Sequence, residues 1–332
     1  MILVTGGAGY IGSHCVLRLM QNGEDVVVFD SLENGHEETI KTLSSADLPG
    51  KFVAFVQGDL KNPADIAFVF QQYEIEAVVH FAAYIRVEES MSDPEKYYQN
   101  NVGGTLNLLS AMRAAGVDKI VFSSTAATYG EPEYTPIDES HPQKPINPYG
   151  MSKLMVERIM DDFDMAYGIR SVRLRYFNVV GNDPENRIGE LHVPETHLIP
   201  NILKSVDASG REFSMFGTDY DTRDGTCVRD YVNVNDLIDA HMLALSYLRK
   251  GGKTDYFNLG TNDGSTVREV FSVCQDVVGK EIPLKECGRR DGDPAVLVAD
   301  NRKAREVLGW EPKRTFRESI ECAWAWEKKN RV

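Results

Sequence analysis

Short apolar runs, many of them β-branched, alternate with longer amphipathic stretches through the first half of the chain. The runs that we interpret as strands are residues 1–6, 25–30, 52–59, 77–83, 119–125 and 170–178. The amphipathic stretches between them predict helices, and several of these end on a glycine, such as Gly23, Gly116 and Gly168. Nearly continuous apolar strands that alternate with helices are typical of a parallel sheet covered on both faces. The pattern therefore predicts a doubly wound α/β fold with helices on both faces.

The pattern changes after about residue 177, where turn-forming residues and prolines become frequent. Beyond them, "VNDLIDAHMLALSYLRK", "AREVLGWEP" and "ESIECAWAWEKK" predict helices, and residues 256–261 predict a strand. We therefore expect two domains. Residues 1–177 form the first, and residues 178–332 form a smaller C-terminal α/β domain from which some chain returns to the first.

The charge limits the classes of partner. The 332 residues carry a formal net charge of -14, and an acidic surface repels nucleic acid and anionic membranes. No apolar run approaches the ~20 residues of a membrane span, and the chain starts directly with a strand instead of a targeting segment. We expect a cytoplasmic protein with neither a nucleic-acid nor a membrane partner.

The cysteines and histidines do not predict a disulfide framework or a metal site. The five cysteines include no C-x-x-C pair. His192 and His197 are close in sequence, but we find no acid or cysteine beside them at ligand spacing. We expect no metal.

A glycine-rich turn, "TGGAGYIGSH", joins the first strand to the first helix. Gly6, Gly9 and Gly12 give a tight turn whose backbone can approach a pyrophosphate at the positive end of the helix. Asp30 ends the second strand, 18 residues after Gly12, where a carboxylate accepts hydrogen bonds from an adenosine ribose and repels a 2′-phosphate. Together these features predict a Rossmann-type fold that binds NAD in preference to NADP.

A candidate catalytic pair lies in "NPYGMSKLMVER". Tyr149 and Lys153 are four residues apart, so they share one face of a helix that begins just after Pro148. A tyrosine with its ordinary pKa near 10 is a poor base at neutral pH. A neighbouring ammonium favours the phenolate and lowers that pKa, so the pair is typical of a phenolic general base.

Six motifs spread over the chain carry a resemblance to a known family: "TGGAGYIG", "SSTAATYG", "YGMSK", "RYFNVVG", "VRDYV" and "RRDGDPAVLVAD". With these the sequence resembles the extended short-chain dehydrogenases/reductases, and among them the UDP-hexose 4-epimerases. The resemblance implies reversible oxidation at sugar C4, which interconverts UDP-galactose and UDP-glucose through a 4-keto intermediate with NAD as a recycled cofactor. It also implies a homodimer built from helices near residues 95–115 and 149–166.

The resemblance also implies a set of site residues. The catalytic group is Thr125, Tyr149 and Lys153. NAD is expected to contact Gly6, Gly9, Tyr10, Ile11, Gly12, Asp30, Ser31, Asn34, Gly35, Asp59, Leu60, Phe81, Ala82, Ala83, Asn100, Ser123, Tyr149, Lys153, Tyr176 and Phe177. The UDP-sugar is expected to contact Thr125, Tyr149, Asn178, His197, Leu198, Phe216, Arg229, Arg290, Asp293 and Leu297.

Four positions bear on the reaction that the resemblance implies. Sugar-nucleotide 4,6-dehydratases of similar fold carry an Asp-Glu pair directly after the Thr, whereas Ala126 and Ala127 stand here. Without these acids oxidation at C4 has no local elimination partner, which favours epimerisation. Ile85 stands where family members often have a lysine, so a cofactor contact is not expected there. Leu297, at the position that limits sugar size, is intermediate in volume.

Two alternatives stay open on the sequence. One is a 4-epimerase of UDP-N-acetylhexosamines or UDP-pentoses, which Leu297 does not exclude. The other is an NAD-binding regulator without catalysis, which has no need of the Thr125, Tyr149 and Lys153 set.

Overall fold

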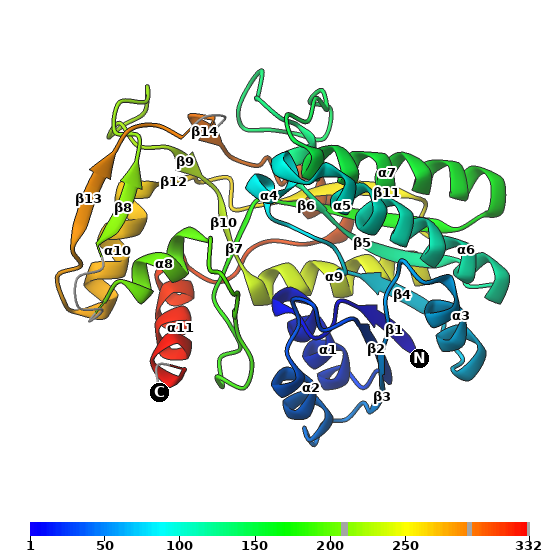
Figure 1. Ribbon diagram of the computed structural model, residues 1–332. Coiled ribbons are helices and arrows are strands. Elements are labelled where there is room, and N and C mark those ends of the chain that lie inside the picture. The colour runs from blue at the N-terminus through cyan, green and yellow to red at the C-terminus, as the bar shows by residue number, and fades with distance from the viewer. Residues whose placement is uncertain (207–211, 291–293, 331–332) are drawn as a thin grey trace.

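A seven-stranded sheet, parallel throughout, forms the centre of the computed structural model, which describes residues 1–206, 212–290 and 294–330 (Figure 1). Its strands are β1 (Ile2–Thr5), β2 (Val26–Asp30), β3 (Phe52–Gln57), β4 (Ala77–His80), β5 (Lys119–Thr125), β6 (Arg170–Tyr176) and β11 (Asp255–Leu259). They lie in the order β11-β6-β5-β4-β1-β2-β3. The predicted doubly wound α/β fold is confirmed. The order reverses between β1 and β4, and ligands of such sheets bind in the crevice at that reversal, beyond the carboxyl ends of the strands.

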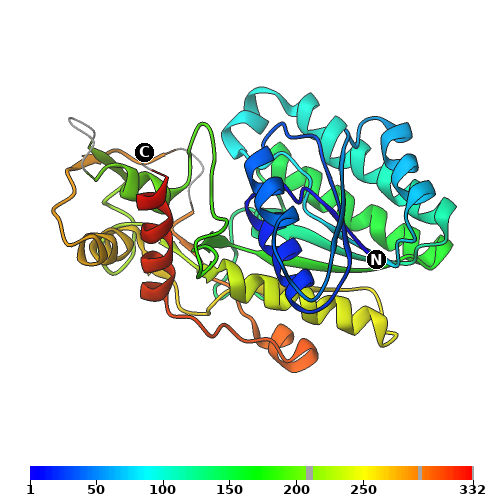
Figure 2. The ribbon, with the colours of Figure 1, turned by 90° about the horizontal axis from the view of Figure 1, so that it is seen from below.

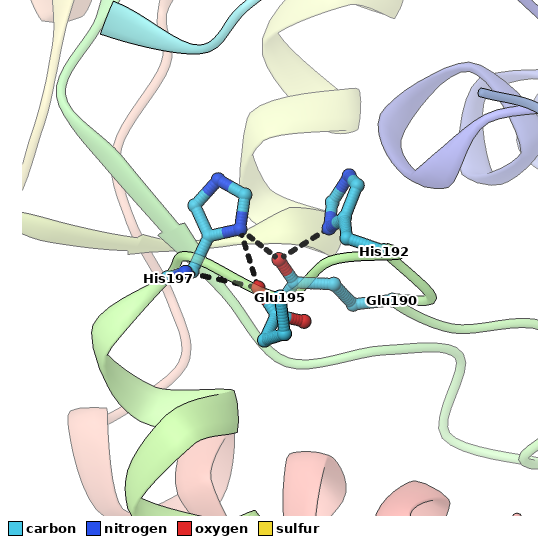
Figure 3. Close-up of side chains that lie close together, drawn as sticks. All are labelled: Glu190, His192, Glu195 and His197. Carbon is cyan, nitrogen blue, oxygen red and sulfur yellow. Dashed lines mark hydrogen bonds and ion pairs between the residues drawn. The ribbon is translucent and has the colours of Figure 1, made fainter. Parts of the chain in front are cut away.

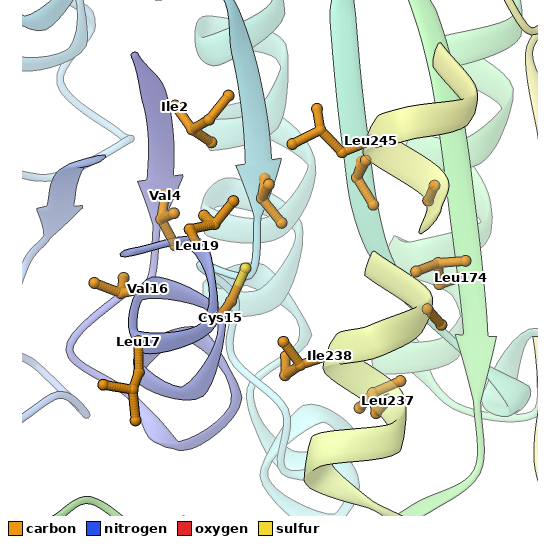
Figure 4. Close-up of a cluster of buried hydrophobic side chains, with 14 of the residues drawn as sticks. Ile2, Val4, Cys15, Val16, Leu17, Leu19, Leu174, Leu237, Ile238 and Leu245 are labelled. Carbon is orange, nitrogen blue, oxygen red and sulfur yellow. The ribbon is translucent and has the colours of Figure 1, made fainter. Parts of the chain in front are cut away.

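Helices cover both faces of this sheet. One face packs against α1 (Tyr10–Gln21), α2 (Glu37–Ser44) and α9 (Val234–Arg249), and the other against α3 (Pro63–Gln72), α6 (Thr105–Ala115) and α7 (Pro148–Tyr167). Figure 4 shows side chains of the first layer, among them Ile2 and Val4 of β1, Cys15 of α1 and Ile238 of α9, which belong to one buried apolar cluster. All four side chains are buried, and each large apolar one contributes about 1.5–3 kcal/mol. The α9 helix comes from the second half of the chain, so the two halves fold together.

A smaller unit lies beside the sheet (Figure 2). It packs α8 (Leu198–Lys204), α10 (Val267–Val278) and α11 (Phe316–Lys329) with the strand pair β8 (Phe213–Phe216) and β13 (Leu284–Cys287) around a separate apolar core. Both α10 and α11 begin with a capping box, formed by Thr266 with Glu269 and by Thr315 with Glu318. Short strands connect this unit to the sheet: β7 (Asn178–Val180), β9 (Val228–Arg229), β10 (Tyr231–Asn233), β12 (Ser265–Thr266) and β14 (Val296–Leu297).

Some predicted elements differ from the observed ones. The strand expected at 170–178 breaks at Phe177, where β6 ends and the chain leaves the sheet as β7. The helix expected in "AREVLGWEP" is a short π-helical stretch, Ala304–Leu308, which ends where Gly309 adopts a left-handed conformation with φ of 68°. A π-helical segment, Tyr98–Gly104, precedes α6. Within the described residues, no helix combines the length and apolar character that crossing a membrane requires.

Candidate active site

Of the three glycines predicted to approach the pyrophosphate, Gly6 and Gly12 are required by the fold and Gly9 is not. A Cβ at Gly6, whose φ is +74°, would lie 2.6 Å from the Ala82 nitrogen, and a Cβ at Gly12 would lie 2.1 Å from the Gly6 carbonyl oxygen. At Gly9, by contrast, the nearest heavy atom outside its chain neighbours is the Gly6 oxygen at 3.4 Å, an ordinary contact. Gly9 caps α1 without a side-chain hydrogen bond. The helix therefore presents its first N–H groups to an open space that suits a pyrophosphate.

Asp30 stands beside this turn at the end of β2. Its buried carboxylate accepts hydrogen bonds from the backbone N–H groups of Ala8, at 3.0 Å, and Leu32, at 2.8 Å. Burial raises the pKa of Asp30, and the two N–H groups oppose that rise. Each carboxylate oxygen keeps a second lone pair, so the fixed carboxylate fits the ribose role expected of it.

The other predicted NAD residues follow the same edge of the sheet. Asp59 and Leu60 come after β3, the loop 81–83 comes after β4, and Ser123 lies near the end of β5. Ser31, Asn34 and Gly35 share the loop after β2 with Asp30. The fold thus brings the residues together at the carboxyl ends of neighbouring strands, and their chemistry fits a dinucleotide.

The predicted catalytic residues meet where α7 packs against β5. The Asn147 side chain caps α7 by accepting from the Gly150 N–H at 2.8 Å, and Pro148 occupies the first turn. The Lys153 ammonium donates to the Ser123 carbonyl at 2.9 Å. The Thr125 hydroxyl, at the end of β5, hydrogen-bonds to Tyr149.

Burial dominates the electrostatics of this group in the protein without cofactor. It raises the pKa of Tyr149 to about 12, against the smaller lowering effect of the Thr125 hydrogen bond. It also lowers the pKa of Lys153 to about 7, although the Glu157 carboxylate opposes that change. A phenolate at neutral pH therefore needs positive charge beyond that of Lys153.

A buried ion pair between Glu157 of α7 and Arg175 of β6 joins the helix to the sheet, and it was not predicted from the sequence. The Glu157 carboxylate accepts two hydrogen bonds from the Arg175 guanidinium, at 2.9 and 2.5 Å, and one from the Ser124 hydroxyl at 2.5 Å. Burial disfavours the charge on Glu157, but Arg175 holds its pKa below the usual value. Its spacing from Tyr149 and Lys153, four residues at a time, was the available signal, because it places the three side chains on one helix face.

The predicted substrate residues divide into two groups. Arg229 in β9 and Leu297 in β14 are register partners, and Leu297 packs on the small cluster formed by Ala126, Tyr129 and Ile137 at the catalytic strand end. Farther out, the Arg290 guanidinium carbon lies 4.0 Å from the centre of the Phe216 ring. The Asn178 side chain donates to the Asp230 carbonyl at 3.0 Å. The predicted contact at Asp293 lies outside the described residues.

The expectation about His192 and His197 was wrong on one point, because two acids do stand beside them. Figure 3 shows Glu190 directed toward both rings and Glu195 directed toward His197. The His197 Nδ1 atom lies 3.1 Å from Glu190 and 2.8 Å from Glu195. Burial opposes a charge on His197, but the two carboxylates raise its pKa to about 10. The adjacent Leu198 begins α8.

Comparison with known proteins places the chain among nucleotide-sugar enzymes. A family model described as GDP-mannose 4,6 dehydratase matches residues 3–322. UDP-glucose 4-epimerase of Rhizobium leguminosarum bv. trifolii is 48% identical over 329 residues, which cover 99% of this chain and 98% of the relative. UDP-glucose 4-epimerase of Lactobacillus helveticus is 50% identical over 328 residues, covering 98% of this chain and 97% of the relative.

Comparison with solved structures gives the same family. UDP-glucose 4-epimerase from Brucella ovis in complex with NAD superposes with a TM-score of 0.91 at 42% identity, covering 98% of this chain and 97% of that one. The enzyme of Bifidobacterium longum, in complex with NAD+ and UDP, gives 0.91 at 37% identity and covers 99% and 98% of the two chains.

The open space at Gly9 generates a first prediction. Gly9→Val should keep the fold, at a cost of about 1 kcal/mol for a poorer helix cap, but weaken NAD binding at least tenfold because the side chain fills the pyrophosphate space. Calorimetric NAD titration and thermal unfolding check the two effects. Gly12→Ala is the control, since its Cβ would meet the Gly6 oxygen and destabilise the turn itself. Unchanged NAD affinity in Gly9→Val would contradict this role.

Proposed function

This chain belongs to the family described by the GDP-mannose 4,6 dehydratase model and, within it, to the UDP-glucose 4-epimerases, and we propose from its site how it works. It interconverts UDP-galactose and UDP-glucose with NAD as cofactor. The observation that carries the mechanism is the convergence of Thr125, Tyr149 and Lys153 at the end of β5, with no acid in the two positions that follow Thr125.

Side chains of this site accept the proton of the sugar 4-hydroxyl and later return it. NAD, when bound, would supply the hydride acceptor for C4, and the positive charge of its nicotinamide ring would favour a nearby phenolate. The Tyr149 phenolic oxygen accepts the hydroxyl proton, and Thr125, hydrogen-bonded to that tyrosine, orients the same hydroxyl. Lys153 is fixed on the Ser123 carbonyl and adds charge from the same helix face. Tyr149 would then return the proton to the oxygen at C4, which restores the alcohol.

The two residues after Thr125 favour epimerisation over the elimination of water from the oxidised sugar. Removing water across C5 and C6 of the sugar needs an acid and a base beside the oxidised carbon. Ala126 is buried and Ala127 half-buried, and the Ala127 N–H is held by the Thr125 hydroxyl at 3.1 Å. Glu157 lies on the same helix as the base, but its carboxylate is committed to Arg175. The site therefore returns the oxidised sugar to an alcohol.

The roles of the remaining site residues are also part of this proposal. We propose that Arg229 and Arg290 bind the diphosphate, because a guanidinium can pair with phosphate oxygens in a bidentate manner. Phe216, against which Arg290 packs, offers an aromatic face to the uracil. The two arginines belong to the β9 and β13 ends of the smaller unit, so the nucleotide would bridge the smaller unit and the sheet.

The direct test is proton NMR of UDP-galactose with purified protein and no added NAD. UDP-glucose should appear and approach the same ratio from either side. Tyr149→Phe should retain NAD and lose turnover by several orders of magnitude, because the proton acceptor is gone. Tyr167→Phe, an exposed tyrosine at the end of the same helix, is the matched control and should turn over normally.

Two results would reject this function. A 4-keto-6-deoxy product would show that the site eliminates water despite Ala126 and Ala127. No conversion after NAD is supplied, with NAD still bound, would favour the non-catalytic regulator.

Leu297 supports a second substrate class, the UDP-N-acetylhexosamines. It is half-buried at the catalytic strand end, and a structural relative at 40% identity and TM-score 0.85 is the UDP-Glc/GlcNAc 4-epimerase of Campylobacter jejuni, covering 99% of both chains. Leu297→Tyr should reduce turnover of UDP-N-acetylglucosamine relative to UDP-glucose at least tenfold, since the larger ring occupies space for the acetyl group. Leu297→Met, similar in volume, is the control. An unaltered ratio would show that Leu297 does not limit the pocket.

We further propose a cytoplasmic homodimer. All five cysteines carry free thiols, as is usual in a reducing compartment. The dimer surface is an apolar face on α4 (Val87–Ser92), α6 and α7, which pack together. Its exposed side chains are Val87, Met91, Leu106, Met151, Met155 and Met165.

Met155→Lys should convert the dimer to a monomer, because dimerisation would bury the new charge without a partner. Light scattering after size exclusion measures the mass. Phe68→Lys, which changes an exposed apolar residue on α3, is the control and should leave the dimer intact. A monomeric wild-type protein would reject the proposal.

A further inference from the structure

Four potential metal ligands converge in the segment between β7 and α8. They are Glu190, His192, Glu195 and His197, and one ligand atom from each lies within 4.8 Å of all the others (Figure 3). The chain bends at Val193 and Pro194, between the two Glu–His pairs. All four ligands thus come from eight consecutive residues.

Three of the six spacings between the ligand atoms are close to those of a tetrahedral zinc site, and the others are within 4.8 Å. Zn²⁺ binds imidazole nitrogens and carboxylate oxygens at about 2.0–2.2 Å, so neighbouring ligand atoms of a tetrahedron lie about 3.3 Å apart. The His197 Nδ1 atom lies 2.8 Å from Glu195 and 3.1 Å from Glu190, and the His192 Nδ1 atom lies 3.1 Å from Glu190. Movements of a few tenths of an ångström would reach the zinc geometry at these three edges.

The burial and the hydrogen bonding of the ligands also favour an ion. The Glu195, Glu190 and His192 side chains are only 5%, 12% and 17% exposed, and the fourth, His197, is 45% exposed. His192 Nδ1 is buried and lacks a well-directed hydrogen bond, although Glu190 is near. The Lys204 ammonium lies 3.4 Å from Glu195, on the carboxylate oxygen that does not face His197. Zn²⁺ bound between the two carboxylates and the two imidazole rings would displace the proton that His197 holds in the protein without metal.

Residues 190–197 contact several parts of the molecule that lie around the predicted NAD crevice. The His36 ring, after the Asp30 loop, lies 3.0 Å from the Leu191 carbonyl, and Arg86 donates to the Val193 carbonyl at 2.9 Å. On the other side, Trp326 of α11 donates to the Glu190 carbonyl at 3.0 Å. The His192 ring meets Tyr10 of the glycine turn edge-on, with centroids 6.4 Å apart.

We propose that Glu190, His192, Glu195 and His197 bind one divalent transition-metal ion, of which Zn²⁺ best matches the ligand types, and that the ion fixes this segment across the crevice. Four protein ligands close the coordination shell, which makes the site structural and not catalytic. Mg²⁺ and Ca²⁺ prefer oxygen ligands alone and fit this set poorly.

The test measures metal directly, so its outcome is independent of epimerase activity. NAD-loaded protein is stripped with a chelator, dialysed and titrated with Zn²⁺ by calorimetry, with Mg²⁺ as the second probe. We expect one Zn²⁺ per chain, a raised melting temperature and no Mg²⁺ binding. Co²⁺ in place of Zn²⁺ should give the visible absorption bands of four-coordinate cobalt.

Variants locate the site. His192→Ala and His197→Ala should each weaken Zn²⁺ binding at least tenfold, and His192→Gln serves if the alanine variant unfolds. Glu185→Gln, an exposed acid in the same loop, controls for adventitious binding by an acidic protein and should bind normally. No stoichiometric Zn²⁺ in the wild type, or binding unaffected by the histidine variants, would overturn the proposal and leave the cluster as ion pairs only.

Discussion

The buried ion pair between Glu157 and Arg175 is the interaction on which the catalytic geometry depends. It connects α7, which carries the base and its lysine, to β6, and through the Ser124 hydroxyl it also reaches β5. Both side chains are 2–3% exposed, so each charge is stabilised almost entirely by the other and by the hydrogen bonds around them. Removing one partner of such a pair typically costs about 3–5 kcal/mol, because the remaining charge is left buried and unpaired. The pair therefore fixes the helix axis and rotation, which in turn set where Tyr149 meets Thr125.

Much of the fold and part of the site follow from local sequence. The strands β1, β2 and β4 are buried along their whole length, so they are almost uniformly apolar and easy to find. The glycine turn and the Tyr149–Lys153 pair are likewise spacings within one element or one turn. Glu157 could have been placed on the same helix face, but its partner Arg175 lies on another strand, and only the packed structure brings the two together. The interleaving of α9 and β11 with the first half is non-local in the same way.

The histidine and glutamate cluster shows a different limit. In each Glu–His pair one residue separates the two ligands, Leu191 in the first pair and Thr196 in the second, in a segment that forms neither helix nor strand. In a regular element the period fixes which side chains share a face, whereas here the direction of each side chain depends on bends at Val193 and Pro194. Sequence spacing alone could therefore not show that Glu190 and Glu195 face the two rings. The contacts of Leu191 with His36 and of Glu190 with Trp326, which position the segment, are long-range as well.

The family model carries the name of a dehydratase, while the relatives of high identity are epimerases, and the site explains how both fit one fold. Oxidation at C4 needs the dinucleotide turn and the group formed by Thr125, Tyr149 and Lys153. This requirement is the same whether epimerisation or elimination follows the oxidation. The outcome then depends on whether acids stand beside the oxidised carbon, and at Ala126 and Ala127 they do not. Epimerisation adds a requirement that elimination lacks, because the keto sugar must present its opposite face before hydride returns. Small residues next to Thr125, and the separation of the sugar end from the Arg290–Phe216 end where the nucleotide is proposed to bind, are consistent with a firmly held nucleotide and a sugar free to turn.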